Sequence, residues 1–318
     1  MKTLRVVAPG FLTTVQDLGR EGFGPIGVSA TGAGDAVSLR AGNRLVGNPQ
    51  GAAGLEMTLV GGTFEFPGGA VIALAGSEFG ATVGGATVPA WTAVEVKAGQ
   101  VLTLGPTQGG ARSYLCVRGG IEVDKLLGSA STHILSGLGG MEGRALKRED
   151  VLRIGDAGEA GEGGGFTGRT VAGKPLEKLA ARKVLRATEG PQSDWFPEPA
   201  QKVFYGSTYR VTEEANRMGL RLEGPAIGEG SHGEMITEGV SLGAVQITAA
   251  GLPIILFVEQ QTTGGYAKIA NVISADLHSV GQLRPRDEIR FEKVDWETAR
   301  KLFIEQEELL ASKELIDG

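Results

Sequence analysis

The sequence is poor in cysteine and contains no long hydrophobic run, and each shortage excludes a class of protein. The single cysteine, Cys116, cannot form a disulfide within the chain, which argues against a disulfide-stapled secreted fold. The longest apolar runs, such as Leu252 to Val258, are far shorter than the roughly 20 residues that cross a bilayer. The N-terminus lacks the apolar stretch of a secretory signal peptide. We therefore expect a cytoplasmic protein.

Positive charge is also in short supply. The chain has 31 basic and 37 acidic residues, which gives a formal net charge of -6, and no segment gathers lysine and arginine into a stripe. Non-specific binding to nucleic acid or to an anionic membrane depends on such a basic surface. We therefore expect no nucleic acid and no membrane among its partners.

Glycine, by contrast, is in excess, at 52 of 318 residues, or about 16% against a usual share near 7%. Each glycine inside a helix costs up to about 1 kcal/mol relative to alanine, so long helices cannot carry this surplus. Collagen is excluded because no Gly-X-Y period is present. The composition predicts a turn-rich, mostly β protein.

Short apolar runs separated by glycine recur along the chain and predict strands. Because no regular helices alternate with them, the pattern favours barrels or sandwiches over a doubly wound α/β sheet. The predicted strands are Leu4 to Val7, Val71 to Leu74, Val94 to Val96, Val101 to Leu104, Tyr114 to Val117, Val151 to Ile154, Val184 to Ala187, Tyr209 to Val211, Ala244 to Ile247, Ile254 to Val258, Ile269 to Ile273 and Ile289 to Phe291.

Two segments predict helices. The first begins after Asp35, a candidate N-cap, and stops at Gly47. The second follows Asp295 near the C-terminus, where apolar residues recur every three or four positions, and we expect it to pack on a barrel.

A glycine-rich segment, 156–181, has linker composition and separates the chain into two near-equal halves. We predict a first domain at 1–155 and a second at 182–318 that includes the C-terminal helix. The segments 146–154 and 283–291 share three identities in nine positions and end the two halves. Two related β-barrels, each closing with a similar turn and strand, would leave this echo.

Generic catalytic and metal-binding patterns are missing. The histidines His133, His232 and His278 lie far apart without zinc-ligand spacing, so we expect no metal. The chain has no Gly-x-Ser-x-Gly and no Ser-x-x-Lys. A P-loop-like segment, 168–175, ends in proline where Ser or Thr is needed. Cys116 lies in an apolar strand and is predicted to be a buried hydrophobic residue rather than a nucleophile.

Polar residues within glycine-rich apolar segments are the candidates for a site. In the first half these are Asp17, Arg20, Asn43 and Glu56. Asp17 and Arg20 form either a buried ion pair that holds a loop or a clamp for a substrate carboxylate. Asp35 and Asn48 are better explained as a helix cap and a turn residue.

The second half carries more candidates. The paired glycines after two threonines are able to turn successive backbone N–H groups toward one point, forming a nest for an anion or oxyanion. The alternative is a tight turn that carries polar side chains but has no functional role. The candidates are Asn216, Arg217, Gln246, Glu259, Gln261, Thr262, Thr263, Gly264, Gly265 and Tyr266.

Six ordered motifs together resemble the allophanate hydrolase subunit 2 family, a carboxyltransferase-type family that is also called KipA-like and that includes the C component of 5-oxoprolinase. The resemblance covers about residues 4 to 292. The motifs are Thr14-Val-Gln-Asp-Leu-Gly-Arg20, Asn43-Arg-Leu-Val-Gly-Asn48, Arg112-Ser-Tyr-Leu115 with Gly119-Gly120, Gly128-Ser-Ala-Ser-Thr132, Asn216-Arg-Met-Gly219 and Gln261-Thr-Thr-Gly-Gly-Tyr266.

The resemblance implies two cyclophilin-like β-barrels and one component of an ATP-dependent 5-oxoprolinase, which opens 5-oxoproline to glutamate. Its implied partners are a KipI-like subunit 1, which is the B component of that enzyme, and a LamB/YcsF-like protein, which is the A component. ATP is used by the complex. Two alternatives remain: the carboxyltransferase of a biotin-dependent urea carboxylase or allophanate hydrolase system, and a non-catalytic antagonist of a KipI-type kinase inhibitor.

The residue roles follow as hypotheses. Thr262, Thr263 and the Gly264-Gly265 amides would form an oxyanion or carboxylate cradle, and Arg20 and Arg217 would neutralise an anionic group. Asp17 or Glu259 would act as a base or orient another group. Some positions depart from the family pattern: Glu259 stands where aspartate is usual, and Glu149 and Arg286 replace turn glycines.

Overall fold

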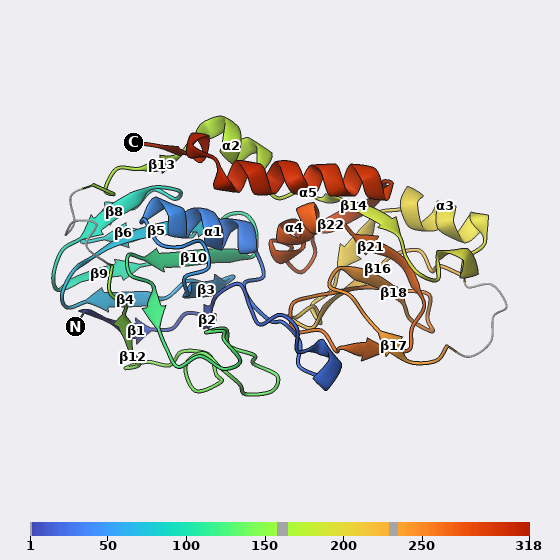
Figure 1. Ribbon diagram of the computed structural model, residues 1–318, viewed down its shortest axis with the longest axis horizontal. Helices are drawn as coiled ribbons and strands as arrows, with labels where there is room; N and C mark the ends of the chain where they lie inside the picture. Colours follow the sequence, from blue (N-terminus) through green and yellow to red (C-terminus); the bar gives the residue numbers. More distant parts are fainter. Residues whose placement is uncertain (1, 158–164, 229–234) are drawn as a thin grey trace. The chain divides into compact units, whose positions relative to one another are not determined.

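The computed structural model describes residues 2–157, 165–228 and 235–318 and is mostly β (Figure 1). The chain divides into two units. The first comprises Met1–Arg20, Thr31–Ala180 and Leu309–Gly318, and the second comprises Glu21–Ala30 and Ala181–Glu308. The main division, between residues 180 and 181, lies beside the predicted end of the linker. The assignment of 21–30 and of 309–318 differs from the predicted domain boundaries.

The described residues of the first unit form short strands, the α-helices α1 and α2, and a 3-10 turn at Lys313–Leu315. Each strand predicted in the first half is present, and the apolar runs set their positions. The strands are β1 Lys2–Ala8, β2 Leu12–Gln16, β3 Gly54–Thr58, β4 Thr63–Phe66, β5 Ala70–Gly76, β6 Thr82–Val83, β7 Ala86–Thr87, β8 Ala93–Val96, β9 Gln100–Thr103, β10 Arg112–Val117, β11 Ile121–Glu122, β12 Val151–Ile154, β13 Thr170–Val171 and β23 Ile316–Asp317; the helices are α1 Ala36–Leu45 and α2 Gly173–Lys178.

Two antiparallel sheets share the core of this unit. Their orders are β11-β12-β1-β4-β9-β6-β7 and β2-β3-β10-β5-β8. In β4 the side chains alternate, so that Phe64 and Phe66 are buried while Thr63 and Glu65 are partly exposed. The two phenylalanines contribute to one hydrophobic cluster with residues of both sheets. The two sheets thus enclose one apolar core, and β13 and β23 of this unit pair as a separate two-stranded sheet.

Helix α1 follows the predicted capping pattern. The Asp35 side chain accepts a hydrogen bond from the Ser38 backbone N–H at 2.8 Å, and Gly47 beyond the helix end has a φ of 73°. The helix packs on β5 and β10, and a Cβ at Gly42 would lie 2.7 Å from the Cys116 sulfur. Cys116 is fully buried, as predicted, and burial raises the pKa of its thiol far above the usual range.

The second unit is built around a closed barrel of seven strands in the order β14-β21-β18-β19-β16-β15-β22 (Figure 1). This confirms the barrel expected for the second half. β14 and β22 pair in parallel and the other neighbours are antiparallel. The strands are β14 Val184–Glu189, β15 Tyr209–Val211, β16 Gly219–Glu223, β18 Ala244–Ile247, β19 Pro253–Leu256, β21 Lys268–Val272 and β22 Glu288–Lys293.

A two-stranded ribbon and several helices complete this unit. The ribbon pairs β17 Glu238–Gly239 with β20 Thr263–Gly264, and it becomes important for the candidate site. The helices are α3 Glu198–Gly206 and α4 Leu277–Gly281, with 3-10 turns at Gly24–Ile26, Ser193–Trp195 and Ser274–Asp276. Apolar side chains from β14, β16, β18, β19 and β21 fill the barrel core.

The predicted C-terminal helix is α5, Trp296–Ala311, and Asp295 caps it through a 2.8 Å bond from the Thr298 N–H. The packing around the C-terminal end of α5 differs from the expectation. Leu310 and Leu315 are buried in a first-unit cluster that includes Val171 and Leu179 from the predicted linker. Glycine-rich composition therefore marks only part of 156–181 as a connector, because the apolar residues beyond it form β13 and α2.

The segments 146–154 and 283–291, which are similar in sequence, also share a structural feature. In both copies a turn precedes the closing strand: the Asp150 N–H bonds to the Lys147 carbonyl at 3.2 Å, and the Asp287 N–H bonds to the Arg284 carbonyl at 3.1 Å. Glu149 has a φ of 71° and Arg286 a φ of 73°. The repeated turn thus places a non-glycine residue in the left-handed region in both units.

Within the first of these turns, Arg144 donates to both oxygens of Asp150, at 2.7 and 3.0 Å. These hydrogen bonds hold the pKa of Asp150 below its usual range. The carboxylate therefore remains charged in the turn at neutral pH.

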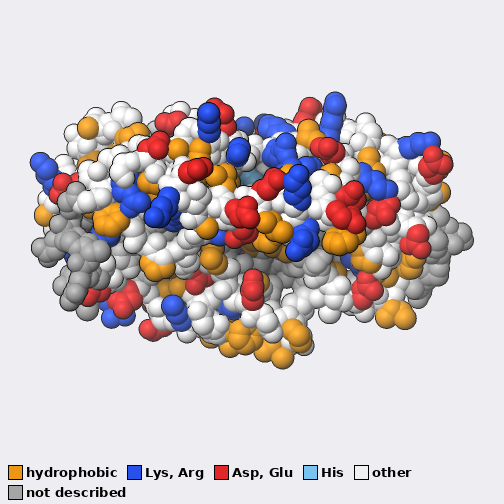
Figure 2. Space-filling model, turned by 45° about the horizontal axis from the view of Figure 1, so that its top comes forward, with side chains coloured by type: hydrophobic (Ala, Val, Ile, Leu, Met, Phe, Trp, Pro, Cys, Tyr) orange, Lys and Arg blue, Asp and Glu red, His pale blue; other side chains and the backbone are white. Residues whose placement is uncertain are grey.

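No described helix is long and apolar enough to cross a membrane. On the face shown in Figure 2, acidic and basic side chains are interspersed. This mixture agrees with the lack of a basic stripe in the sequence.

The turn geometry predicts that Glu149→Gly stabilises the protein. A non-glycine residue in the left-handed region costs about 1–2 kcal/mol, partly offset by the greater unfolded-state entropy of glycine, so we expect a gain of about 0.5–1 kcal/mol. The side chain of Glu149 is 62% exposed, and its ion pairs contribute little. Urea unfolding measures the change.

Arg148→Gly is the matched control, because Arg148 is exposed and is not among the residues with positive φ. It should lower the unfolding free energy by about 0.5–1 kcal/mol. Equal effects of the two glycine substitutions would contradict the account of the turn.

Candidate functional site

The structure distributes the predicted site residues over both units. Asp17, Arg20, Asn43 and Glu56 belong to the first unit, and the candidates from Asn216 to Tyr266 belong to the second.

Asp17 follows β2 and binds the segment that contains the Gly128-Ser-Ala-Ser-Thr132 motif. Its Oδ1 accepts hydrogen bonds from the hydroxyls of Ser129 and Ser131, both at 2.6 Å, and from the Gly19 N–H at 2.8 Å. Its Oδ2 accepts from the Ala130 N–H at 2.7 Å. With these donors around it, the carboxylate fastens two loops together.

Arg20 binds the same pair of loops. Its Nε donates to the Leu126 carbonyl at 3.4 Å, and another guanidinium nitrogen donates to the Ser131 carbonyl. Asp17 and Arg20 thus both bind the segment around Ser131, Asp17 through the Ser131 hydroxyl and Arg20 through the Ser131 carbonyl.

Glu56 lies in β3 and is 2% exposed. One of its oxygens accepts hydrogen bonds from the Gly34 N–H and the Tyr114 hydroxyl, each at 2.7 Å, and the other contacts Arg112 Nε at 3.2 Å. Burial, followed by the charge of Glu56, raises the pKa of Tyr114 well above its usual value. Glu56 therefore joins the β3–β10 pair to the loop before α1.

Asn43 and Asn48 form an amide pair at the end of α1. Asn43 donates to the carbonyls of Gln50 and Ala52, and its oxygen accepts from Asn48 at 3.0 Å. Asn48 also bonds to the Val117 carbonyl. These contacts tie the helix end to β10 and support the turn role predicted for Asn48.

In the second unit the structure brings Arg217 and Glu259 together. Arg217 Nε lies 2.5 Å from Glu259 Oε1, and the two side chains are 6% and 0% exposed. The preceding Asn216 accepts a hydrogen bond from the Met218 N–H at 2.8 Å and shapes the turn before β16. The ion pair fixes this turn to the end of the segment that follows β19.

The segment from Gln261 to Tyr266 has a different backbone from the predicted nest. Thr263 and Gly264 form β20, which is in register with Glu238 and Gly239 of β17. Neither Gly264 nor Gly265 is among the glycines with positive φ. A nest of convergent amides needs a left-handed residue, so pairing with β17 replaces it by extended backbone.

Glycine at 264 instead makes room for Gln246. A Cβ at this position would lie 2.6 Å from Gln246 Nε2 and 3.4 Å from Gln261 Nε2. Val245 and Ile247 are in the barrel core, so Gln246 between them faces the other side of β18, beneath the ribbon. It is 1% exposed, and its Nε2 has no hydrogen-bond partner in the part of the chain that the structure describes. This amide is an unused donor.

Beside Gln246 lies a lysine that the motif analysis missed. Lys268 is the register partner of Gln246 across β18 and β21, which places both side chains on one face. Lys268 Nζ lies 2.8 Å from Glu238 Oε1, and the Gln192 amide donates to the same oxygen at 2.8 Å. The signal available in the sequence was a lysine inside the apolar segment Ala267 to Val272.

These residues form the candidate site, which we call the ribbon cluster: Gln192, Glu238, Gln246, Gly264 and Lys268. Hydrogen bonds from Lys268 and then from Gln192 hold the pKa of Glu238 below its usual range. The cluster therefore combines a buried ammonium, an ionised carboxylate and an unused amide donor. Such a set recognises a small polar ligand through its oxygen atoms.

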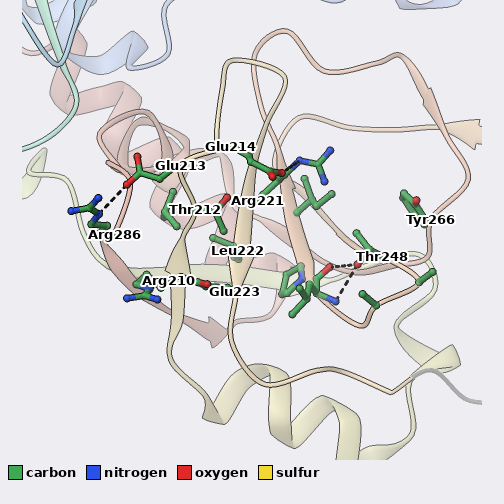
Figure 3. Close-up of a pocket in the computed structure, with 16 residues that line it drawn as sticks. Arg210, Thr212, Glu213, Glu214, Arg221, Leu222, Glu223, Thr248, Tyr266 and Arg286 are labelled. Atoms are coloured by element: carbon green, nitrogen blue, oxygen red, sulfur yellow. Dashed lines mark hydrogen bonds and ion pairs between the residues drawn. The ribbon is translucent and has the colours of Figure 1, made fainter.

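A pocket of about 860 Å³ opens elsewhere on this unit, beside β15 and β16 (Figure 3). Of the predicted residues only Tyr266 lines it, at the opposite end of the view from Arg286 and Glu213. Its arginines and glutamates pair with one another, as in Arg221 with Glu214 at 3.5 Å. The pocket therefore presents a charge-balanced wall.

Among the described residues, no group of three or more His, Cys, Asp or Glu side chains could hold a metal ion. His133 and His278 are buried in different units, and His232 lies outside the described residues.

The comparison with protein families decides the family. Residues 26–293 match the model described as carboxyltransferase domain, subdomain A and B. The chain belongs to this carboxyltransferase domain family. The matched segment includes the second-unit barrel and the whole ribbon cluster.

Two relatives of this carboxyltransferase-family protein match it along almost their whole length. It is 38% identical over 300 residues to the C component of 5-oxoprolinase from Escherichia coli, covering 94% of this chain and 93% of the relative. It is 35% identical over 289 residues to that of Haemophilus influenzae, covering 91% and 90%. The urea amidolyase of Saccharomyces cerevisiae is 34% identical over 329 residues, but the chain spans only 18% of it.

Solved structures agree with this membership. The Kluyveromyces lactis urea carboxylase superposes with a TM-score of 0.90 at 33% identity, over 97% of this chain and 29% of that one. The K. lactis urea amidolyase gives a TM-score of 0.89 at 32% identity, over 97% and 20%. The carboxyltransferase fold is thus present within much larger proteins.

The buried ion pair between Arg217 and Glu259 predicts that the stability of the protein depends strongly on Arg217. Arg217→Ala leaves the Glu259 carboxylate buried without this partner and should cost about 3–5 kcal/mol of unfolding free energy. The double variant Arg217→Met with Glu259→Leu removes both charges and should recover more than half of that loss. Denaturant unfolding of the full chain measures both. A double variant as unstable as the single one would contradict this account.

Proposed function

We propose that this chain is the C component of an ATP-dependent 5-oxoprolinase. The observation that carries the proposal is the match to two proteins of that name along at least 90% of their length. Its implied partners are a KipI-like protein and a LamB/YcsF-like protein, and the location is the cytoplasm. ATP is the co-substrate of the complex.

The reaction explains what the complex has to supply. In 5-oxoproline the ring amide is a poor electrophile, so its C–N bond breaks slowly in water. Water supplies the oxygen of the new carboxylate, the ring nitrogen becomes the amine of glutamate, and ATP hydrolysis to ADP and phosphate drives the reaction. Charge that develops on the amide oxygen is stabilised by donors already in place.

The ribbon cluster supports a role in holding the substrate. Gln246 Nε2 is buried without a hydrogen-bond partner among the described residues, and it packs against the bare backbone of Gly264. Thr262, Thr263, Gln261, Gly265 and Tyr266 flank this position along the chain, and we assign the main donor role to Gln246 in place of the predicted nest of backbone amides.

The charged candidates fit positioning roles. Asp17 accepts hydrogen bonds from four donors, and Glu259 is paired with Arg217. Carboxylates engaged in this way orient loops more readily than they accept a proton from substrate. We assign Asp17, Glu259, Arg20 and Arg217 to the support of the substrate-holding segments.

A second candidate is favoured by the structural comparison. The fold matches urea carboxylase at a TM-score of 0.90. In that case the chain would transfer a carboxyl group from biotin to urea or a similar amide, and it would need a biotin carboxylase and a biotin carrier.

Reconstitution tests the proposal. We expect co-expression with KipI-like and LamB/YcsF-like proteins of the same genome to yield a complex that consumes 5-oxoproline and ATP together. Omission of this chain should lower the rate at least about tenfold. Glutamate and ADP are quantified in parallel.

The control reaction replaces 5-oxoproline by urea, with bicarbonate, a biotin carboxylase and its carrier. Carboxylation of urea without turnover of 5-oxoproline would overturn the proposal in favour of the second candidate. Co-purification of the three proteins without either reaction would overturn it in favour of the non-catalytic antagonist.

A further inference from the structure

Lys268 is the most deeply buried lysine ammonium with a described ion pair. Its side chain is 2% exposed, whereas the lysines of the other described ion pairs are at least 48% exposed. Withdrawing an ammonium from water is costly unless an anion and further acceptors compensate. Here the compensation comes from Glu238 at 2.8 Å and from the Tyr266 carbonyl at 3.3 Å.

The anion that compensates Lys268 is much less fixed than the lysine. The Glu238 side chain is 43% exposed, and its residue belongs to the two-residue strand β17. Gln192, which donates to Glu238, is itself held by the Lys268 N–H at 3.2 Å. The buried Lys268 ammonium and the Gln192 amide thus face the Glu238 carboxylate, which can turn into solvent.

The unused amide of Gln246 lies on the same face. It is paired with Lys268 across β18 and β21, next to a register shift between Val245 and Gln246, and the two residues contact the same ribbon: Gln246 packs against Gly264, and Lys268 binds Glu238. A buried donor without a partner costs free energy unless a ligand or water supplies an acceptor. The cluster therefore has more donor capacity than Glu238 uses.

We propose that Lys268, Gln192 and Gln246 form a subsite for a small carboxylate ligand, and that Glu238 occupies this subsite in the ligand-free chain and leaves when the ligand binds.

The chemistry of the donors fits this exchange. A carboxylate has two planar oxygens that accept several hydrogen bonds, and charge-assisted bonds to an ammonium are about twice as strong as neutral ones. Glu238 already presents such a group to Lys268 and Gln192, at 2.8 Å from each. On leaving, it reaches water because its side chain is half-exposed.

This inference rests on the proposed function for the identity of the ligand and names the part of the substrate that the cluster recognises. 5-Oxoproline carries a carboxylate beside its ring, whereas urea is neutral. The subsite therefore favours an amino-acid-derived lactam over urea at this position.

Binding measurements on the full chain within the reconstituted complex, without ATP, test the subsite. Lys268→Met should weaken 5-oxoproline binding at least about tenfold, because a charge-assisted contact is lost. Glu238→Gln should tighten it about threefold or more, because the ligand no longer competes with an internal anion. Lys293→Met, at an exposed pair with Glu189, should change it less than about twofold.

The matched ligand is 2-pyrrolidinone, which is 5-oxoproline without its carboxylate. Its binding should be weaker and should not respond to Glu238→Gln. Equal affinity for the two lactams would overturn the subsite. Weaker 5-oxoproline binding in Glu238→Gln would overturn the displacement, since Glu238 would then be part of the binding surface.

Folding is checked by the thermal unfolding of each variant, and Glu238→Gln keeps the shape of the side chain. Failure of the proposed function is separable: a complex that binds carboxylates through Lys268 but does not turn over 5-oxoproline retains the subsite and loses the assigned reaction. Conversely, a complex that turns over 5-oxoproline but binds it equally well with Lys268→Met retains the assigned reaction and loses the subsite.

Discussion

A side chain at residue 264 would displace the Gln246 amide, and the candidate site depends on this contact. The Nε2 atom of Gln246 lies 2.6 Å from the position that a Cβ would take. Because the backbone is bare there, the ribbon of β17 and β20 lies directly over the outer face of β18 and β21. That cover buries the Gln246 amide and the Lys268 ammonium and brings Glu238 to the lysine. A polar cluster is thereby assembled on a barrel whose interior is apolar.

The motifs of the two units use their polar residues in different ways. In the first unit, Asp17 forms hydrogen bonds that join loops, Asn43 binds at a helix end, and Glu56 binds a strand pair. In the second, Arg217 and Glu259 fix a turn. In the ribbon cluster, the buried Gln246 amide has no hydrogen-bond partner among the described residues. Motif residues that fasten the backbone and residues that face a ligand are alike in sequence, and only their partners separate them.

Much of the fold was predictable from sequence because the apolar runs are short and clearly bounded by glycine. All the predicted strands, the Asp35 cap of α1 and the Asp295 cap of α5 are present. Helix α3 was not predicted, although the prolines at its start and the glycine at its end are typical of helix boundaries.

The site was harder to predict, for physical reasons. Two glycines after two threonines suit a nest as well as a strand that needs a bare face, and the choice between them depends on β17, which lies far away in sequence. Gln246 and Lys268 meet through the register of a barrel, although they are 22 positions apart in the sequence. A single sequence does not reveal such a register, although a lysine within an apolar strand was a visible signal.

The most direct test of the account compares alanine at the two neighbouring glycines in the reconstituted complex. Neither position has a positive φ, so backbone strain does not distinguish them. A Cβ at 264 displaces the Gln246 amide, whereas a Cβ at 265 meets only Thr237 Oγ1 at an ordinary 3.5 Å. The account predicts that Gly264→Ala lowers 5-oxoproline turnover at least about tenfold while Gly265→Ala stays within about twofold. Equal rates for the two variants would contradict it.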